Sequence, residues 1–161
     1  MLTGVKVASS GEMKRNLPLN LIVVIVGALS LATALETSGV IALTTNTLMP
    51  FLAGADWFVA LVVIYLLTLV LTEFVTNNAA AALMFPFAYG LVQILGAPLM
   101  PFALAVAFAA SASFISPFGY QTNLLVYNAA NYRYAHFIKM GLPISVVYST
   151  IVLTLLNITY L

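Results

Sequence analysis

The chain has 161 residues, of which 63% are hydrophobic and only 6% are charged, and its formal net charge is +1. An ordinary soluble domain carries about 25% charged residues. This chain therefore lacks the polar residues needed to cover a water-facing surface, and its main solvent is lipid. The absence of cysteine excludes a disulfide framework, a thiol nucleophile and a cysteine-ligated metal. The small net charge gives no indication of nucleic-acid binding.

The first third of the sequence contains one apolar stretch long enough to cross a bilayer. Residues 1–16 are polar and carry both signs of charge, so we expect a short aqueous lead-in. A span is predicted over residues 17–36, because a crossing helix needs roughly 20 apolar residues. Glu36 and Gly39 are suited to end that helix. Residues 40–56 are richer in Thr, Asn, Pro and Gly and are predicted to lie at the membrane interface.

Residues 57–95 form two apolar arms around the polar centre Thr76-Asn77-Asn78. Neighbouring helical residues point about 100° apart, so these three side chains cannot share one helix face. They fit the turn of a hairpin, in which Asn caps the following helix, expected from Ala79. We predict a re-entrant hairpin that enters and leaves on the same face of the membrane. A plain loop between two full spans would give the same pattern.

A third apolar run starts the predicted segment 101–130 and is interrupted at residues 116–123. Pro117 removes a backbone donor and disfavours helix in the residue before it. Gly119 lowers helix propensity further. We therefore predict one discontinuous helix, renewed from Leu124, with a proline kink or an exposed loop as the alternatives.

The last span is predicted over residues 138–160, after a basic connection that contains Arg133, His136 and Lys139. Basic segment ends favour the cytoplasmic side. If residues 1–16 lie on the cytoplasmic side, the first span carries the chain to the outside, and the hairpin enters the membrane from there. The discontinuous helix then returns the chain to the cytoplasmic side, where the second basic cluster lies. The sequence thus predicts an all-α, multi-pass transmembrane helical bundle with one re-entrant hairpin and one discontinuous helix.

The two interruptions carry the polar groups that a site at membrane depth needs. Irregular backbone in a bilayer is tolerated only where it lines protein or a water-filled cavity. Each interruption opens a new helix, whose N-terminus attracts anions. Freed carbonyls and amide oxygens are hard ligands suited to Na⁺. We predict a sodium and anion site, with sodium held through Asn77 and Asn123, built from Thr76, Asn77, Asn78, Gly119, Tyr120, Gln121, Thr122 and Asn123.

Glu73 lies three residues before the first interruption, in a long stretch without other charges. A carboxyl group is costly in lipid, so Glu73 is either an ion or proton site or an acceptor for backbone donors near the hairpin tip. We favour the acceptor. The chain offers no nucleophile–base pair and no metal-ligand cluster, which argues against an enzyme and against any cofactor besides a coupling sodium.

At these interruptions the sequence resembles the divalent anion/sodium symporter family of the ion-transporter superfamily. Residues 71–80 look like the second hairpin tip of that family, with Thr76-Asn77-Asn78 where the family has Ser-Asn-Thr. Residues 113–123 look like the broken helix of the same repeat, and residues 27–39 like the helix before the hairpin. The dicarboxylate carriers have a Thr-Pro-Pro-Asn-type break, whereas residues 120–123 look more like the branch that carries a TrkA-C-type domain and includes sulfate carriers.

The resemblance implies one repeat, the C-terminal one, of an inverted-repeat transporter in a bacterial plasma (inner) membrane. Its function would be uptake of a divalent anion, either sulfate or a dicarboxylate, coupled to sodium by alternating access. Its partners would be membrane lipid and a missing first-repeat half that completes the site, with a homodimer as the complete form. Two alternatives are a truncated or scaffold membrane protein that does not transport, and a sodium/proton antiporter of the same superfamily in which Glu73 carries the proton.

Overall fold

The computed structural model describes residues 56–129 and 132–160, and also Val23, Val26, Gly27, Ser30, Thr33, Ala34, 37–40, Leu43 and Thr47. The predicted lead-in over residues 1–16 lies outside the described residues, as does most of the predicted segments 17–36 and 40–56. Between residues 56 and 160 the described chain is all-helical and has no strand, in agreement with the predicted fold class. Its helices are α4 (Trp57–Thr72), α5 (Asn77–Leu95), α6 (Leu99–Ala110), α7 (Gln121–Ala129) and α8 (Tyr134–Tyr160).

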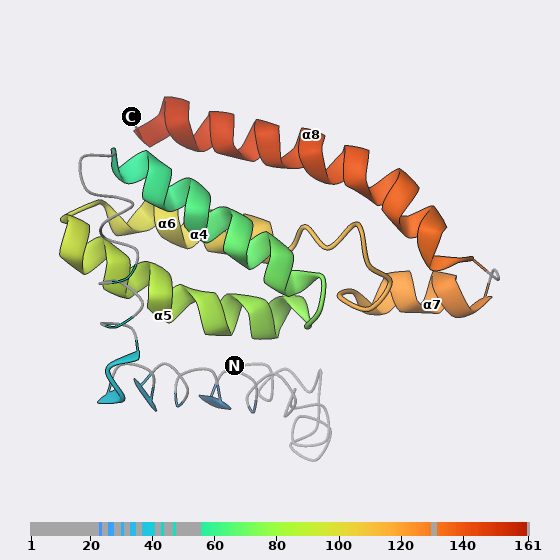
Figure 1. Ribbon diagram of the computed structural model, residues 1–161, viewed down its shortest axis with the longest axis horizontal. Helices are drawn as coiled ribbons and strands as arrows, with labels where there is room; N and C mark the ends of the chain where they lie inside the picture. Colours follow the sequence, from blue (N-terminus) through green and yellow to red (C-terminus); the bar gives the residue numbers. More distant parts are fainter. Residues whose placement is uncertain are drawn as a thin grey trace, which may run out of the picture.

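Helices α4 and α5 are antiparallel neighbours joined by residues 73–76 (Figure 1). Thr76 is the N-cap of α5, because its hydroxyl accepts a hydrogen bond from the Ala79 N–H at 3.4 Å. Gly96 ends α5 in the left-handed region, with φ of 63°, where its N–H donates to the Val92 carbonyl. α5 therefore starts at Asn77, two residues before the start that the sequence indicates, and both ends of the helix carry a local cap.

The core lies where α6 packs between α4 and α5 (Figure 1). α4 presents a buried stripe at helical spacing, including Leu61, Tyr65 and Thr68. α6 faces it with Phe102 and with small buried alanines such as Ala105, which allow the helices to approach closely. This arrangement sets the ends of α4 and α6 near one another, at the side of the molecule where both interruptions lie.

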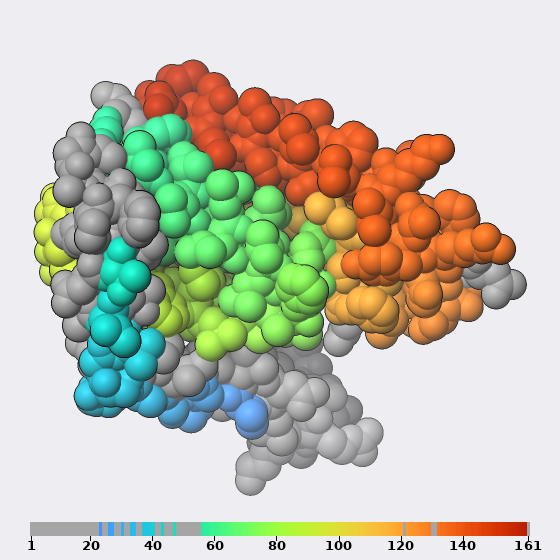
Figure 2. Space-filling model, in the orientation of Figure 1, coloured from blue at the N-terminus to red at the C-terminus, as the bar shows by residue number. Residues whose placement is uncertain are grey.

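Helix α8 is the longest element, with 27 residues, and returns along the α4–α6 layer (Figure 1). The Tyr65 hydroxyl donates to Ser149 Oγ at 3.1 Å, and this buried hydrogen bond joins α4 to α8. The Tyr148 hydroxyl donates to the Phe108 carbonyl at 3.3 Å and joins α8 to α6. Figure 2 shows α8 lying along α4, with the segment that follows α6 filling the angle between the end of α4 and the start of α8.

α8 begins at Tyr134, four residues before the predicted span 138–160. The start is explained by a local cap, because the Arg133 N–H donates to Nδ1 of His136 at 3.2 Å. His136 and Lys139 therefore lie in the first turns of the helix and are not part of a connecting loop.

Of the described helices, α5 and α8 are long and apolar enough to cross a bilayer, whereas α4 and α6 are shorter. At about 1.5 Å per residue, the 16 residues of α4 rise about 24 Å, less than the roughly 30 Å of a bilayer core. Most exposed side chains of α8 beyond its first turns are apolar, as suits lipid contact, and they include Val146, Val147, Ile151, Leu155 and Ile158.

We expect Tyr65→Phe to lower the free energy of unfolding by about 1 kcal/mol, because it removes the buried hydrogen bond to Ser149 and little else. Denaturant titration in detergent micelles would measure the loss. Ser149→Ala should cost a similar amount, and the double variant should cost no more than either single one. Additive losses would show that the two hydroxyls do not interact.

Candidate functional site

The structure brings the two interruptions together. Residues 73–76, between α4 and α5, face residues 111–120, between α6 and α7 (Figure 1). The buried Thr72 hydroxyl donates to the Ala110 carbonyl at 2.6 Å. Gly119 packs so closely on the Thr72 carbonyl and the Ser113 hydroxyl that a Cβ at this position would overlap both atoms. The end of α4 is thus in direct contact with both ends of the second interruption.

Glu73 holds the second interruption through both carboxylate oxygens. Its Oε1 accepts from the N–H groups of Phe114 at 3.2 Å and Ile115 at 3.1 Å. Its Oε2 accepts from the Ser116 N–H at 2.6 Å and from the Ser113 hydroxyl at 3.3 Å. Glu73 therefore binds backbone donors, but these donors belong to the second interruption and not to the hairpin tip, where the sequence analysis placed them.

These hydrogen bonds explain why α6 ends before the predicted break at residues 116–123. In a continued helix the Phe114 N–H would donate to the Ala110 carbonyl. Here Ala110 accepts from Thr72, and the Phe114 N–H is shared between the Ala112 carbonyl at 3.0 Å and Glu73. The helix therefore ends at Ala110, and the irregular segment covers residues 111–120.

Asn77 links the start of α5 to the same segment. With its amide oriented so that the nitrogen meets acceptors, Nδ2 donates to the Gly119 carbonyl at 3.0 Å and to the Ala110 carbonyl at 3.2 Å. Oδ1 then turns away from these two carbonyls. Asn77 is half-buried at this junction, and the peptide that precedes α7 is held against the hairpin.

Asn123 binds the segment from its other side. Its Nδ2 donates to the Ser113 carbonyl at 3.0 Å and to the Ser116 carbonyl at 3.4 Å. α7 begins at Gln121 and not at Leu124, so Asn123 lies in the first turn of a helix. The two predicted sodium ligands, Asn77 and Asn123, are thus found on the same irregular segment, and each contacts it through the amide nitrogen.

The other predicted site residues are distributed around this junction. Gly119 is buried within it, and Gln121 is the first residue of α7. The exposed members of the set are Thr76, Asn78, Tyr120 and Thr122. Of these, Thr76 is the N-cap of α5.

Sequence reasoning assigned no role in the site to Thr72 or Ser113. Both are buried, and both hydroxyls make hydrogen bonds between the two interruptions. Ser116 is also buried, and its hydroxyl accepts from the Phe118 N–H at 2.9 Å. The available signal was position, because Thr72 stands four residues before the polar centre at residues 76–78, Ser113 stands three residues before the proline-containing break at residues 116–123, and Ser116 lies within that break.

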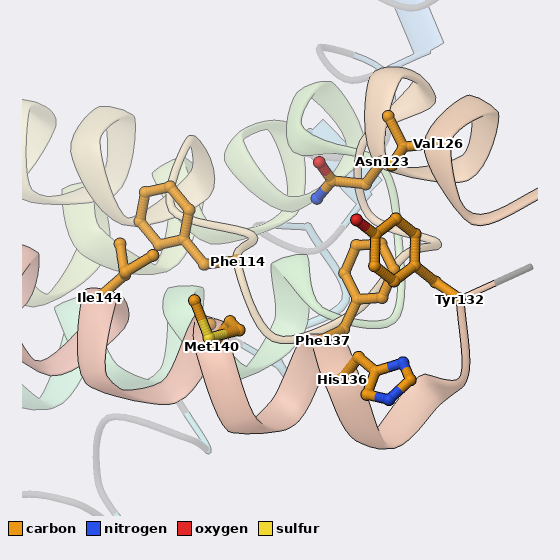
Figure 3. A pocket seen from close by; sticks show the side chains of 9 residues that line it. Phe114, Asn123, Val126, Tyr132, His136, Phe137, Met140 and Ile144 are labelled. Atoms are coloured by element: carbon orange, nitrogen blue, oxygen red, sulfur yellow. The ribbon is translucent and has the colours of Figure 1, made fainter. Parts of the chain in front are cut away.

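A pocket of about 300 Å³ opens beside this junction, between residues 111–120, α7 and the first turns of α8 (Figure 3). Asn123 is its one predicted site residue. The rest of the lining is mainly aromatic and apolar, and consists of Phe114, Val126, Tyr132, His136, Phe137, Met140, Gly141 and Ile144. The pocket therefore adjoins the irregular segment at Phe114 and meets α7 at Asn123.

The family model described as "Sodium:sulfate symporter transmembrane region" matches residues 10–160. The chain belongs to the sodium:sulfate symporter family. The resemblance found at the two interruptions is thereby confirmed, and the chain is an integral membrane protein of a transporter family.

Relatives of this family member are similar over most of its length. An uncharacterized transporter of Synechocystis is 40% identical over 141 residues, which is 85% of this chain and 22% of the relative. Sodium/sulfate cotransporter 1 of Chlamydomonas reinhardtii is 40% identical over 123 residues, 76% of this chain and 14% of the relative. An uncharacterized transporter of Escherichia coli is 36% identical over 126 residues, 78% of this chain and 21% of the relative. The chain therefore spans about a fifth or less of the length of these relatives.

Proposed function

We propose that this chain is the C-terminal half of the membrane domain of a sodium-coupled divalent-anion transporter that works by alternating access. The observation that carries the proposal is the junction of the two interruptions, which joins a hairpin tip to the break of a discontinuous helix. Chlamydomonas relatives described as sodium/sulfate cotransporters favour sulfate over a dicarboxylate. The form of residues 120–123 supports the same choice.

The helix ends at the junction supply the attraction for an anion. α5 begins at Asn77 and α7 at Gln121, and each N-terminus carries roughly half a positive charge and unpaired N–H groups. The irregular backbone between α6 and α7 supplies carbonyl oxygens for sodium, together with the amide oxygens of Asn77 and Asn123. The exposed Thr76, Asn78, Tyr120 and Thr122 would line the side of the site that a first-repeat half closes.

The α4–α5 pair would be a re-entrant hairpin. α4 is short for a full crossing, and Glu73 in the loop after it binds irregular backbone, as a hairpin tip at membrane depth would. In the complete protein a first-repeat half would provide the opposite wall, and two such proteins would form a homodimer in a bacterial inner membrane. The antiporter alternative is less supported, because both oxygens of Glu73 are engaged by the chain's own donors.

The test is sodium-dependent uptake of radiolabelled sulfate by this chain co-expressed with its first-repeat half. We expect Asn77→Ala and Asn123→Ala each to weaken the apparent sodium affinity about tenfold or more. Each variant removes an amide at the junction, and a hydrogen bond or ligand to a charged group is worth roughly 1.5–3 kcal/mol.

The control is Asn157→Ala, near the far end of α8, which should change the sodium affinity little. Equal losses at all three positions would indicate a folding defect and remove the site assignment. Sodium-driven uptake by the 161 residues alone would refute the half-transporter proposal, and its absence with the partner half present would favour a scaffold.

A further inference from the structure

The irregular segment at residues 113–116 is held from two opposite sides. On one side Glu73 accepts three consecutive backbone N–H groups and the Ser113 hydroxyl. On the other side Asn123 donates to the carbonyls of Ser113 and Ser116. The two holding residues come from different elements, because Glu73 follows α4 and Asn123 belongs to α7.

The geometry of a trans peptide connects these two sets of hydrogen bonds. In a planar trans unit the N–H of one residue points opposite to the carbonyl of the residue before it. Glu73 and the Ala112 carbonyl together hold the N–H of Phe114, and this orientation turns the Ser113 carbonyl toward Asn123, whose Nδ2 lies 3.0 Å away. By the same geometry, the Ile115 N–H fixes the Phe114 carbonyl, which lies against Gly141 of α8.

The same donors form a concave anion site that the chain fills with its own carboxylate. Successive backbone N–H groups directed at one point are a common way to bind an anion. Here Glu73 occupies that position, with its closest contact at 2.6 Å from the Ser116 N–H. A transported anion is therefore excluded from these donors and is left to the N-termini of α5 and α7.

We propose that Glu73 is a positioning residue, which holds the backbone of residues 113–116 against Asn123 and α8 beside the sodium site and keeps the transported anion away from the N–H groups of this segment. The effect of Glu73 on sodium dependence rests on the proposed function. The positioning itself can be measured without transport.

The first experiment follows the segment directly in the purified chain. The natural chain has no cysteine, so Ile115→Cys, at a half-buried position, reports when the segment opens to a maleimide in detergent solution. We expect Glu73→Gln to accelerate this labelling about tenfold, because an amide nitrogen replaces one carboxylate oxygen and faces donors. Asp56→Asn is the matched control, because Asp56 is exposed and its side chain makes no cap hydrogen bond, and it should leave the rate unchanged.

The second experiment measures sodium dependence in the assembly with the first-repeat half. Glu73→Gln should raise the sodium concentration for half-maximal uptake about tenfold with a smaller effect on maximal rate, and Glu73→Asp should recover part of the loss. Unchanged sodium dependence together with lost pH dependence would identify a proton carrier and overturn the proposal. If the unaltered assembly shows no sodium-dependent uptake, the proposed function fails, and the labelling rates still decide the positioning role.

A folding failure of Glu73→Gln would not remove the test. Ser113→Ala deletes one of the four donors and leaves the carboxylate in place. It should accelerate labelling at position 115 about threefold, which corresponds to the lower end of the free energy expected for one hydrogen bond. An unchanged rate in this variant, or in Glu73→Gln, overturns the proposal.

Discussion

Gly119→Ala should destabilise the chain strongly, because an added methyl group has no room at this position. The added Cβ would overlap the Thr72 carbonyl and the Ser113 hydroxyl. The carbonyl belongs to the last turn of α4, so it cannot turn aside as a flexible side chain does. Overpacking typically costs about 1–3 kcal/mol, and we expect about 3 kcal/mol or more here, because the clash is with backbone. Denaturant titration of the purified chain would measure the loss.

Gly27→Ala is the matched control, because a Cβ at Gly27 meets no atom within 4 Å. It should leave the unfolding free energy within a few tenths of a kcal/mol of the parent or raise it slightly, since alanine favours helix. A Gly119→Ala protein as stable as this control would show that the hairpin tip and the second interruption are not in contact. The junction proposed as the sodium and anion site would then lose its geometric basis.

The sequence predicts well where its signals are local. The arms on either side of Thr76-Asn77-Asn78 become α4 and α5, because a threonine hydroxyl is a good N-cap wherever it stands before an apolar run. Gly96 ends α5 for an equally local reason, its left-handed backbone. Even so, the start of α5 differs from the predicted Ala79 by two residues, because both asparagines enter the helix once Thr76 takes the capping role.

The end of α6 could not be read from the sequence, because its cause is tertiary. Pro117 marks a break, but the helix has already ended at Ala110. The decisive groups are Thr72 and Glu73, some forty residues earlier in the chain, which bind the Ala110 carbonyl and the Phe114 N–H. A prediction from composition and proline position sees only the segment itself, and so it places the break too late.

The candidate site shows the same division. That two irregular stretches should meet follows from the cost of unpaired backbone groups in lipid. Which atoms meet does not follow, because an asparagine can present either an oxygen or a nitrogen. Asn77 and Asn123 were expected to bind sodium through oxygen. The Asn123 nitrogen donates to the Ser113 carbonyl, and the Asn77 nitrogen faces the Gly119 and Ala110 carbonyls once its amide is oriented to meet acceptors. Their oxygens remain for a cation, so sodium ligation by these residues stays a prediction.

Gly141→Ala should weaken the junction from the side of α8 by a comparable amount. The added Cβ would overlap the Phe114 carbonyl and lie 3.0 Å from Ile115 Cα. Neither contact involves a movable side chain, so α8 or the segment has to shift. We expect a loss of about 3 kcal/mol in unfolding free energy and faster maleimide labelling of Ile115→Cys, even though every hydrogen bond of Glu73 is chemically intact.

The neighbouring variant Leu142→Ala is the control for Gly141→Ala, because Leu142 is 49% exposed and its truncation leaves the contact with Phe114 untouched. It should change neither the stability of the junction nor the labelling rate by much. If Gly141→Ala destabilises the chain but leaves labelling at position 115 unchanged, α8 moves away as a unit and the segment is held by Glu73 and Asn123 alone. If labelling rises as it does in Glu73→Gln, the segment needs support from the hairpin and from α8 together, because its backbone is the surface on which both elements pack.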